Sequence, residues 1–294
     1  MHEIKAGQTT FAFRPDAEPV LRIQPGETVK FETSPAPSER LLTAGDRWLE
    51  LVDVREINAV TGPVYVDGAE PGDAISVEIL DVVPGPWGWN AFIPNFGLLG
   101  DRPGLAGIQR LPIEDGRIIV SETLSLPVKP MIGCLGLAPA RGESSTLGPA
   151  FPWGGNFDLV QVKPGNTVLF PVQVSGGLFS LGDLHAAMGR GEATSVSIEC
   201  PGTATVRLGL RKGMTLETPR IETPDRIYTI GLRPKGDYEG SQKQAISLMF
   251  EYLTMERGLS PWDAYVVCSA VVDIEYGGPA GSITLASVRY DLLG

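Results

Sequence analysis

The residues of this chain best suited to chemistry lie between Leu178 and Glu199, around an internal histidine. The 294 residues contain only two histidines, His2 at the N-terminus and His185 in this segment. Asp183 comes two positions before His185, and Glu192 comes seven positions after it. Imidazole and carboxylate groups are common metal ligands, and a glutamate can also transfer a proton. The segment therefore predicts a metal site or a proton-transfer site.

The spacing within this segment suggests how these groups could meet. In an extended strand, side chains two positions apart point to the same face, so Asp183 and His185 would lie roughly 6–7 Å apart and could bind one cation. The run Met188-Gly189-Arg190-Gly191 predicts a turn. Residues 192–199 alternate and predict a returning strand, from which Glu192 could swing back as a general base or a third ligand. The competing interpretation is a tight hairpin in which Asp and His only hydrogen-bond the backbone.

Other candidate residues stand in turn-rich or aromatic stretches. Asn156 and Asp158 follow a pair of glycines and could point into the same site, with Asp158 as a carboxylate ligand or as a turn cap. Glu70 lies in a turn signal and is a candidate pocket carboxylate. Trp87 and Trp89 could wall a pocket around a small substrate, or could pack in an ordinary surface loop.

The segment around His185 also resembles the signature of the acetamidase/formamidase family, which is close to GD-x-HAAQGDGE and here reads GDLHAAMGRGE. Further blocks resemble the family in the family's order: TGPVYV (61–66), GAEPGD (68–73), WGW (87–89) with FGLL (96–99), IGCLGLAPA (132–140) and GGNFD (154–158). The resemblance covers about residues 18–275. It implies homo-oligomers and the hydrolysis of a small carboxamide with release of ammonia.

The chain departs from the family pattern at three places. Met188 and Arg190 stand where the signature has glutamine and aspartate, and the Ser34–Glu39 loop replaces a stretch with an aspartate and Gly-Gln. Arg190 could pair with Glu192 and hold it ionised. Three functions stay open: a metal-dependent amidase, a relative that acts on another C–N substrate such as a cyclic amide, and a non-catalytic binding protein with a decayed site.

The site expected from these residues is a divalent metal centre, with zinc or calcium as the ion. A bound cation would lower the pKa of water or polarise the amide oxygen, and Glu192 would carry the proton from water to the leaving nitrogen. The expected metal ligands are Asp183, His185 and Asp158, the catalytic residues are Glu192 and His185, and the substrate contacts are Trp87, Trp89, Asn156 and Glu70.

Composition limits the classes of partner. The net charge of −11, without clusters of lysine and arginine, argues against nucleic acid and anionic membrane surfaces. No apolar run approaches ~18 residues and the start lacks a signal-peptide core, so we expect a cytoplasmic protein. The cysteines at 134, 200 and 268 stand in apolar contexts and are expected to be buried thiols.

The elements that must position the site are expected to be mainly strands. The 36 glycines and 25 prolines favour many turns, and three strand–Pro-Gly–strand units recur near residues 20–33, 63–82 and 159–174. We expect a mainly β (α+β), β-sandwich-like fold with a few helices. Residues 1–294 would form a single domain, or two intimately packed halves of about 1–150 and 151–294.

Two helices are expected near the C-terminus. The first covers 241–257 and stops at Gly258, and the second runs through 261–272 after the N-cap Ser260. The second helix is apolar almost all round and is expected to be buried. This apolar surface, together with the family resemblance, predicts a homo-oligomer, a dimer or higher.

Overall fold

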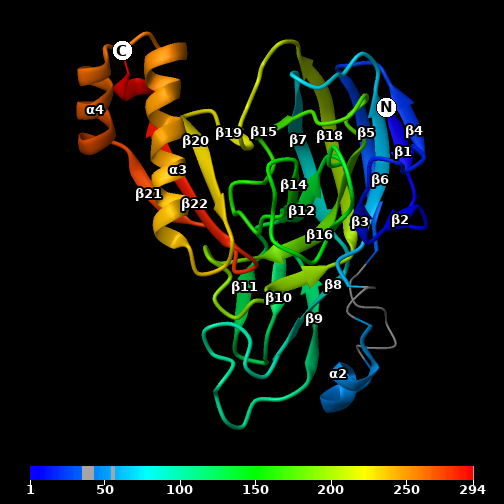
Figure 1. Ribbon diagram of the computed structural model, residues 1–294. Helices are drawn as coiled ribbons and strands as arrows, with labels where there is room; N and C mark the ends of the chain where they lie inside the picture. The colour runs from blue at the N-terminus through cyan, green and yellow to red at the C-terminus, as the bar shows by residue number, and fades with distance from the viewer. Residues whose placement is uncertain (35–42, 54–56, 294) are drawn as a thin grey trace.

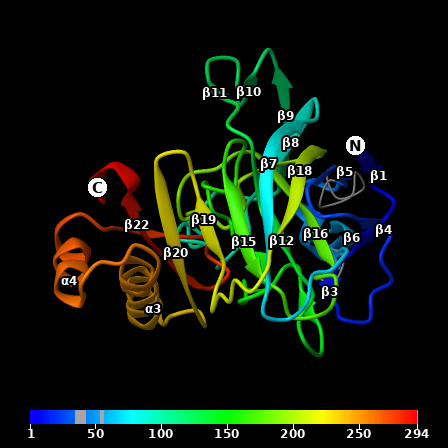
Figure 2. The same cartoon turned by 90° about the horizontal axis from the view of Figure 1, so that it is seen from above.

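The computed structural model describes residues 1–34, 43–53 and 57–293 of the chain. The fold is mainly β with a few helices, two of them near the C-terminus, as the sequence predicts. Figures 1 and 2 show the strands gathered in the middle of the molecule and the two C-terminal helices at one end. None of the helices in these ranges is long and apolar enough to cross a membrane.

The first large sheet has nine strands in the described part of the chain, and neighbouring strands run antiparallel except for the first pair. Its order is β1 (His2–Ile4), β5 (Glu27–Thr33), β18 (Gly202–Arg211), β7 (Ala74–Pro84), β15 (Thr167–Pro171), β19 (Arg220–Glu222), β20 (Arg226–Arg233), β22 (Ser282–Arg289) and β21 (Asp273–Tyr276).

The second large sheet carries the candidate site. Its main path is β11 (Ser125–Pro127), β10 (Arg117–Ile119), β9 (Ile108–Glu114), β8 (Trp87–Ala91), β17 (Ile198–Cys200), β16 (Phe179–Ala187), β12 (Met131–Gly136) and β14 (Gly154–Asn156). The strand β6 (Val60–Val66) joins β16 and pairs with β2 (Thr9–Thr10) and β4 (Leu21–Ile23), while β3 (Ala12–Phe13) and β13 (Ser144–Ser145) form a small separate sheet.

The two large sheets enclose one hydrophobic core, as in a β-sandwich. Along β5, Val29 and Phe31 are fully buried, whereas the lysine and glutamate that alternate with them are half-buried. The Phe31 ring meets the ring of Phe179 on β16 edge-on, with centroids 5.9 Å apart. The alternation read from the sequence therefore turns one face of each sheet inward.

The three Pro-Gly sequences form turns, as the sequence predicts. Gly26, Gly72 and Gly165 have φ angles of 91°, 98° and 89°, which suit the third residue of a type II turn. Strands from both halves of the chain alternate in the nine-stranded sheet, where β18 lies between β5 and β7.

The C-terminal helix α3 (Tyr238–Glu251) covers β20 and β22 at one end of the molecule, and α4 (Pro261–Ala270) packs against α3 (Figure 2). The π-helical turn η3 (Tyr252–Glu256) continues α3. The other helical segments within the described residues are η1 (Gly45–Arg47), α2 (Trp48–Leu51) and η4 (Tyr290–Leu292). The start of α4 is as predicted, because the Ser260 hydroxyl accepts a hydrogen bond from the Asp263 N–H at 3.1 Å.

The prediction that α4 is buried is wrong for this chain. Ala264 is fully buried near α3, but Trp262 is 73% exposed and Tyr265 is 62% exposed. A helix with apolar residues on all sides has apolar surface all round. The sequence of the helix does not show whether the rest of the same chain covers that surface. Within the described ranges only one face of α4 is packed.

Candidate active site

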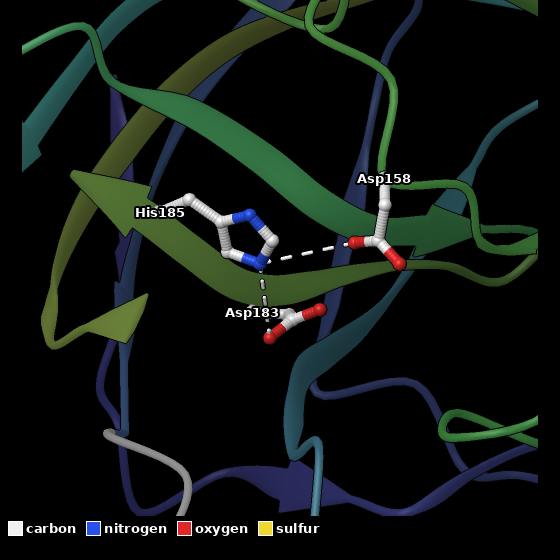
Figure 3. A group of neighbouring side chains, drawn as sticks. All are labelled: Asp158, Asp183 and His185. Atoms are coloured by element: carbon white, nitrogen blue, oxygen red, sulfur yellow. Dashed lines mark ion pairs between the residues drawn. The ribbon is translucent and has the colours of Figure 1, made fainter. Parts of the chain in front are cut away.

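The candidate site is centred on the imidazole of His185, which lies on β16. Asp183 lies on the same strand, and Asp158 follows β14. Figure 3 shows one carboxylate oxygen of each aspartate turned toward the Nε2 atom of the histidine. The Asp183 Oδ1 atom is 3.5 Å from Nε2, and the Asp158 Oδ1 atom is 3.8 Å from it. The structure thus brings together the three residues expected to bind a metal.

The backbone at both aspartates is unusual. Asp183 has a φ of 58° and Asp158 a φ of 47°, in the left-handed region that costs a non-glycine residue roughly 1–3 kcal/mol. The predicted strand geometry is therefore wrong at Asp183, since this residue is not extended within β16. The left-handed backbone still leaves the carboxylate beside His185. Strain of this kind persists where the surrounding structure enforces it, as at many functional sites.

Gly133 on β12 lies against the point where the three side chains converge. A Cβ atom at this position would lie 2.6 Å from Asp183 Oδ2, 2.7 Å from Asp158 Oδ1 and 2.8 Å from His185 Nε2. The Gly133 carbonyl also accepts a hydrogen bond from the Asp158 N–H at 3.2 Å. The glycine therefore helps to fix one ligand and leaves room in front of all three.

Two further carboxylates complete the cluster. Glu199 on β17 pairs with His185 across the β16–β17 ladder, and its Oε2 atom is 3.0 Å from Nε2. The other oxygen of Glu199 accepts a hydrogen bond from the Ser197 N–H at 3.0 Å. Ligand atoms of His185, Glu192 and Glu199 all lie within 4.8 Å of one another. Glu192 thus reaches the site as predicted, whereas sequence reasoning assigned no role to Glu199 or Gly133.

The segment that carries Glu192 differs from its prediction. The returning strand expected over 192–199 is only Ile198–Cys200, and residues 192–197 form a loop. Glu192 has a φ of 41°, and its carbonyl accepts a hydrogen bond from the Ser195 N–H at 2.8 Å. This tight turn interrupts the alternation and directs the Glu192 carboxylate inward.

Burial dominates the electrostatics of the carboxylates. It raises the pKa of Asp158 well above its ordinary range, assisted by repulsion from Glu192, and it raises the pKa of Glu192 to about 8. Burial also raises the pKa of Glu199. For Asp183, burial opposes ionisation, but the charge of His185 and the hydrogen bonds to the Asp183 carboxylate together outweigh burial and lower the pKa.

The histidine carries too little charge to balance its neighbours. Burial disfavours its charged form, but the charges of Glu199 and Asp183 and the hydrogen bonds to their carboxylates together outweigh burial and raise the pKa of His185 well above its ordinary range. Even a charged imidazole faces four buried carboxyl groups. Asp158 Oδ1 and His185 Nδ1 are buried without a hydrogen-bond partner among the described residues. Buried acids gathered around a small open space, with an unpaired oxygen, fit the requirements of a bound cation.

The cluster opens into a cavity of about 500 Å³. At the polar end, the Asn58 side-chain amide donates a hydrogen bond to the Asn156 Oδ1 atom at 3.0 Å, and both residues line the cavity. Trp89 also lines it and is buried. The predicted positions of Asn156 and Trp89 near the site are therefore consistent with the structure.

Two residues expected to contact substrate lie elsewhere. Trp87 does not line the cavity, and the guanidinium of Arg110 sits over its ring at 4.3 Å from the centroid. Glu70 is exposed and accepts a hydrogen bond from the Ser175 hydroxyl at 2.6 Å. The Pro-Gly turn that follows Glu70 holds it at the surface.

Met188 and Arg190, which depart from the family signature, do not line this cavity. Arg190 is exposed and its Nε atom is 3.0 Å from the Glu275 Oε2 atom. Among the described residues Arg190 thus pairs with Glu275, and not with Glu192, the partner considered from the sequence. Met188 is half-buried and does not line this cavity. Of the Ser34–Glu39 loop, residues 35–39 lie outside the described residues.

The comparisons with known proteins agree along the whole chain. A model of the acetamidase/formamidase family matches residues 3–146 and 140–279. The chain is similar to the crystal structure of an acetamidase from Bacillus halodurans, with 32% identity, a TM-score of 0.92 and coverage of 99% of both chains. It is also similar to the crystal structure of a predicted acetamidase/formamidase from Thermoanaerobacter tengcongensis, with 29% identity, a TM-score of 0.92 and coverage of 99% of this chain and 96% of that one.

Among curated proteins, the chain resembles a formamidase from Methylophilus methylotrophus, with 26% identity over 265 residues. That match covers 70% of this chain and 65% of the formamidase, slightly less than two thirds of its length.

Proposed function

The chain belongs to the acetamidase/formamidase family, and from that premise we propose that it is a metal-dependent amidase that hydrolyses a carboxamide to a carboxylate and ammonia. The observation that carries this proposal is the convergence of Asp158, Asp183 and His185 on the open space beside Gly133. The acids of this cluster are buried at the polar end of a cavity.

The metal would be held by the two aspartates and by Nε2 of the histidine. Imidazole with carboxylates is a zinc donor set, and the excess of carboxylate oxygens also suits calcium. When bound, a divalent cation would supply polarisation of the amide oxygen or a lower pKa for water. The second group of potential ligands, formed by His185 with Glu192 and Glu199, shares the imidazole. We assign the metal to the first group because its ligand atoms surround the point beside Gly133.

Glu192 is the proposed proton carrier. Its carboxylate would take a proton from the attacking water and give it to the amide nitrogen, so that ammonia leaves with the carbon–nitrogen bond broken. Burial raises the pKa of Glu192 to about 8 in the metal-free protein. A bound cation would lower this pKa toward the operating pH, at which a general base and acid works best. Glu199, fixed by the hydrogen bond from Ser197, would hold the imidazole in place.

Asn156 and Trp89 are the proposed substrate contacts. The Asn156 Oδ1 atom already accepts from Asn58, so its amide N–H groups remain to bind a substrate oxygen. Trp89 stands beside Glu199 in the β8–β17 ladder and offers an apolar surface close to the acids.

The proposal is tested by metal analysis together with ammonia release from a panel of primary amides. We expect about one divalent ion per chain, and ammonia release that a chelator abolishes and zinc or calcium restores. A protein that gains no metal from either ion and releases no ammonia would instead be a non-catalytic member of the family.

A further inference from the structure

We propose that the preferred substrates are carboxamides with a bulky, ring-bearing apolar acyl group, rather than formamide or acetamide. This inference rests on the amidase function proposed above and names its substrate class. It is carried by the size and lining of the cavity into which the acid cluster opens.

The cavity is much larger than the smallest amides need. Its volume of about 500 Å³ falls within the roughly 300–1,000 Å³ typical of pockets that bind drug-sized ligands. Acetamide carries only one methyl group beside the reacting carboxamide, so it would leave most of this space unfilled. A ligand that fills an apolar pocket gains affinity in proportion to the apolar surface that it removes from water.

The wall beyond the acids is apolar and partly aromatic. It includes the side chains of Trp48, Trp89, Ile93, Phe96, Leu147 and Ala280. Trp48 and Trp89 are 3% and 5% exposed and belong to one small hydrophobic cluster. Apart from the acid cluster, Lys235 is the one charged residue among the described residues that line the cavity. Lys235 is exposed, and its Nζ atom is 5.0 Å from the centre of the Phe96 ring. This lining favours a neutral aromatic group.

The wall and the acids are close enough to serve one substrate. Trp89 pairs with Glu199 across the β8–β17 ladder, and Val196 follows Glu192 in the same loop. A carboxamide placed at the acids would therefore direct its acyl group along the tryptophans.

The first test compares kcat/KM for phenylacetamide and acetamide with the metal-loaded protein. We expect kcat/KM to be at least about tenfold higher for phenylacetamide. In an apolar pocket a single extra methylene group on the substrate already changes kcat/KM about 10-fold or more. A chain that hydrolyses acetamide as well as or better than phenylacetamide overturns this inference and leaves the amidase proposal intact. Ammonia release from neither amide contradicts the amidase proposal itself.

The second test narrows the cavity. Ala280→Phe places a ring in the wall, and we expect the ratio of the two kcat/KM values to move about tenfold toward acetamide. Ala140→Phe adds the same ring at an exposed position outside the cavity and should leave the ratio unchanged. If Ala280→Phe fails to fold, Leu147→Trp makes the same change from a partly exposed position in the wall. A ratio unchanged in the folded cavity variant overturns the inference.

Discussion

At the scale of single residues, Gly133 is the position whose replacement should reveal the metal centre most clearly. A methyl group there would come within 2.8 Å of three ligand atoms, so Gly133→Ala should lose most of the bound metal and lower ammonia release at least about 100-fold. Gly189→Ala is the matched control, because a Cβ at Gly189 has open space around it. Elemental analysis showing full metal in folded Gly133→Ala would place the ion elsewhere.

The two histidines form a natural pair for testing the imidazole ligand. We expect His185→Ala to lose the metal, because the buried carboxylates alone supply no nitrogen ligand. His2→Ala should keep the metal, since the His2 ring hydrogen-bonds the carboxylate of Glu27 at 3.0 Å and His2 belongs to neither group of potential metal ligands. Metal-to-protein ratios measured on both purified variants decide the matter, and equal ratios would remove His185 from the site.

Glu192 should separate proton transfer from metal binding. Glu192→Gln is nearly isosteric but carries no proton at neutral pH, so kcat should fall about 10²–10⁴-fold while metal content and thermal stability stay close to wild type. Loss of metal together with activity would make Glu192 a ligand. Unchanged turnover on the best substrate would remove it from the mechanism.

The sequence predicts most of this cluster, but not its geometry. Asp158, Asp183, His185 and Glu192 were identifiable because acids and a lone internal histidine stand in glycine-rich blocks. Glu199 and Gly133 were not, because their roles come from strand neighbours: Glu199 lies opposite His185 in the β16–β17 ladder, and Gly133 faces the ligands from β12. Register between distant strands cannot be read from local spacing.

At the scale of elements, the sequence predicts correctly those features that depend on residues close together in the chain. It does not predict those that depend on contact with a distant segment. The Pro-Gly turns and the Ser260 cap are local interactions between near neighbours, and both were predicted correctly. The strand expected over 192–199 failed because the turn after Glu192 breaks the alternation. The burial of α4 failed because burial depends on what covers the helix.

At the scale of the whole molecule, the buried acids should make the metal-free protein sensitive to pH. The pKa of Glu192 rises from near 4.5 to about 8 on folding, so its contribution to stability is complete below about pH 4.5 and is lost as the pH rises through 8. The pKa of His185 is also raised on folding, so the stability that His185 contributes is likewise lost as the pH rises above the ordinary pKa of histidine. We expect the melting temperature of the chelator-treated protein to fall between pH 5 and pH 9.

The matching measurement repeats this pH series with saturating zinc. Metal binding competes with protons, so the stabilisation by zinc should grow as the pH rises. Glu192→Gln should flatten the profile of the metal-free protein. A melting temperature that rises across this range without metal would contradict the assigned direction of both pKa shifts.

The exposed face of α4 leads us to expect association of the chain. Trp262 stacks on Tyr265 with ring centroids 5.7 Å apart, and both rings are largely exposed. Light scattering should give a mass at least twice 31.4 kDa, and Trp262→Glu should shift it toward the monomer. Glu239→Lys, which changes charge on α3, serves as a control. A mass of one chain at all concentrations would refute the expectation.

The separation of the acid cluster from the cavity wall has a consequence for how the proposed activity could diversify. The acids lie on strands of the sandwich and in the segments that directly follow those strands. A substitution there disturbs both the strained backbone and the buried charges. Much of the apolar wall comes from α2, from the stretch after β8 and from the turn at 279–280, which lie at the periphery of the sandwich. Mutation or recombination in these segments could retune acyl preference while leaving the hydrolytic apparatus untouched, so a selection library confined to them should yield new specificities at little cost in folding.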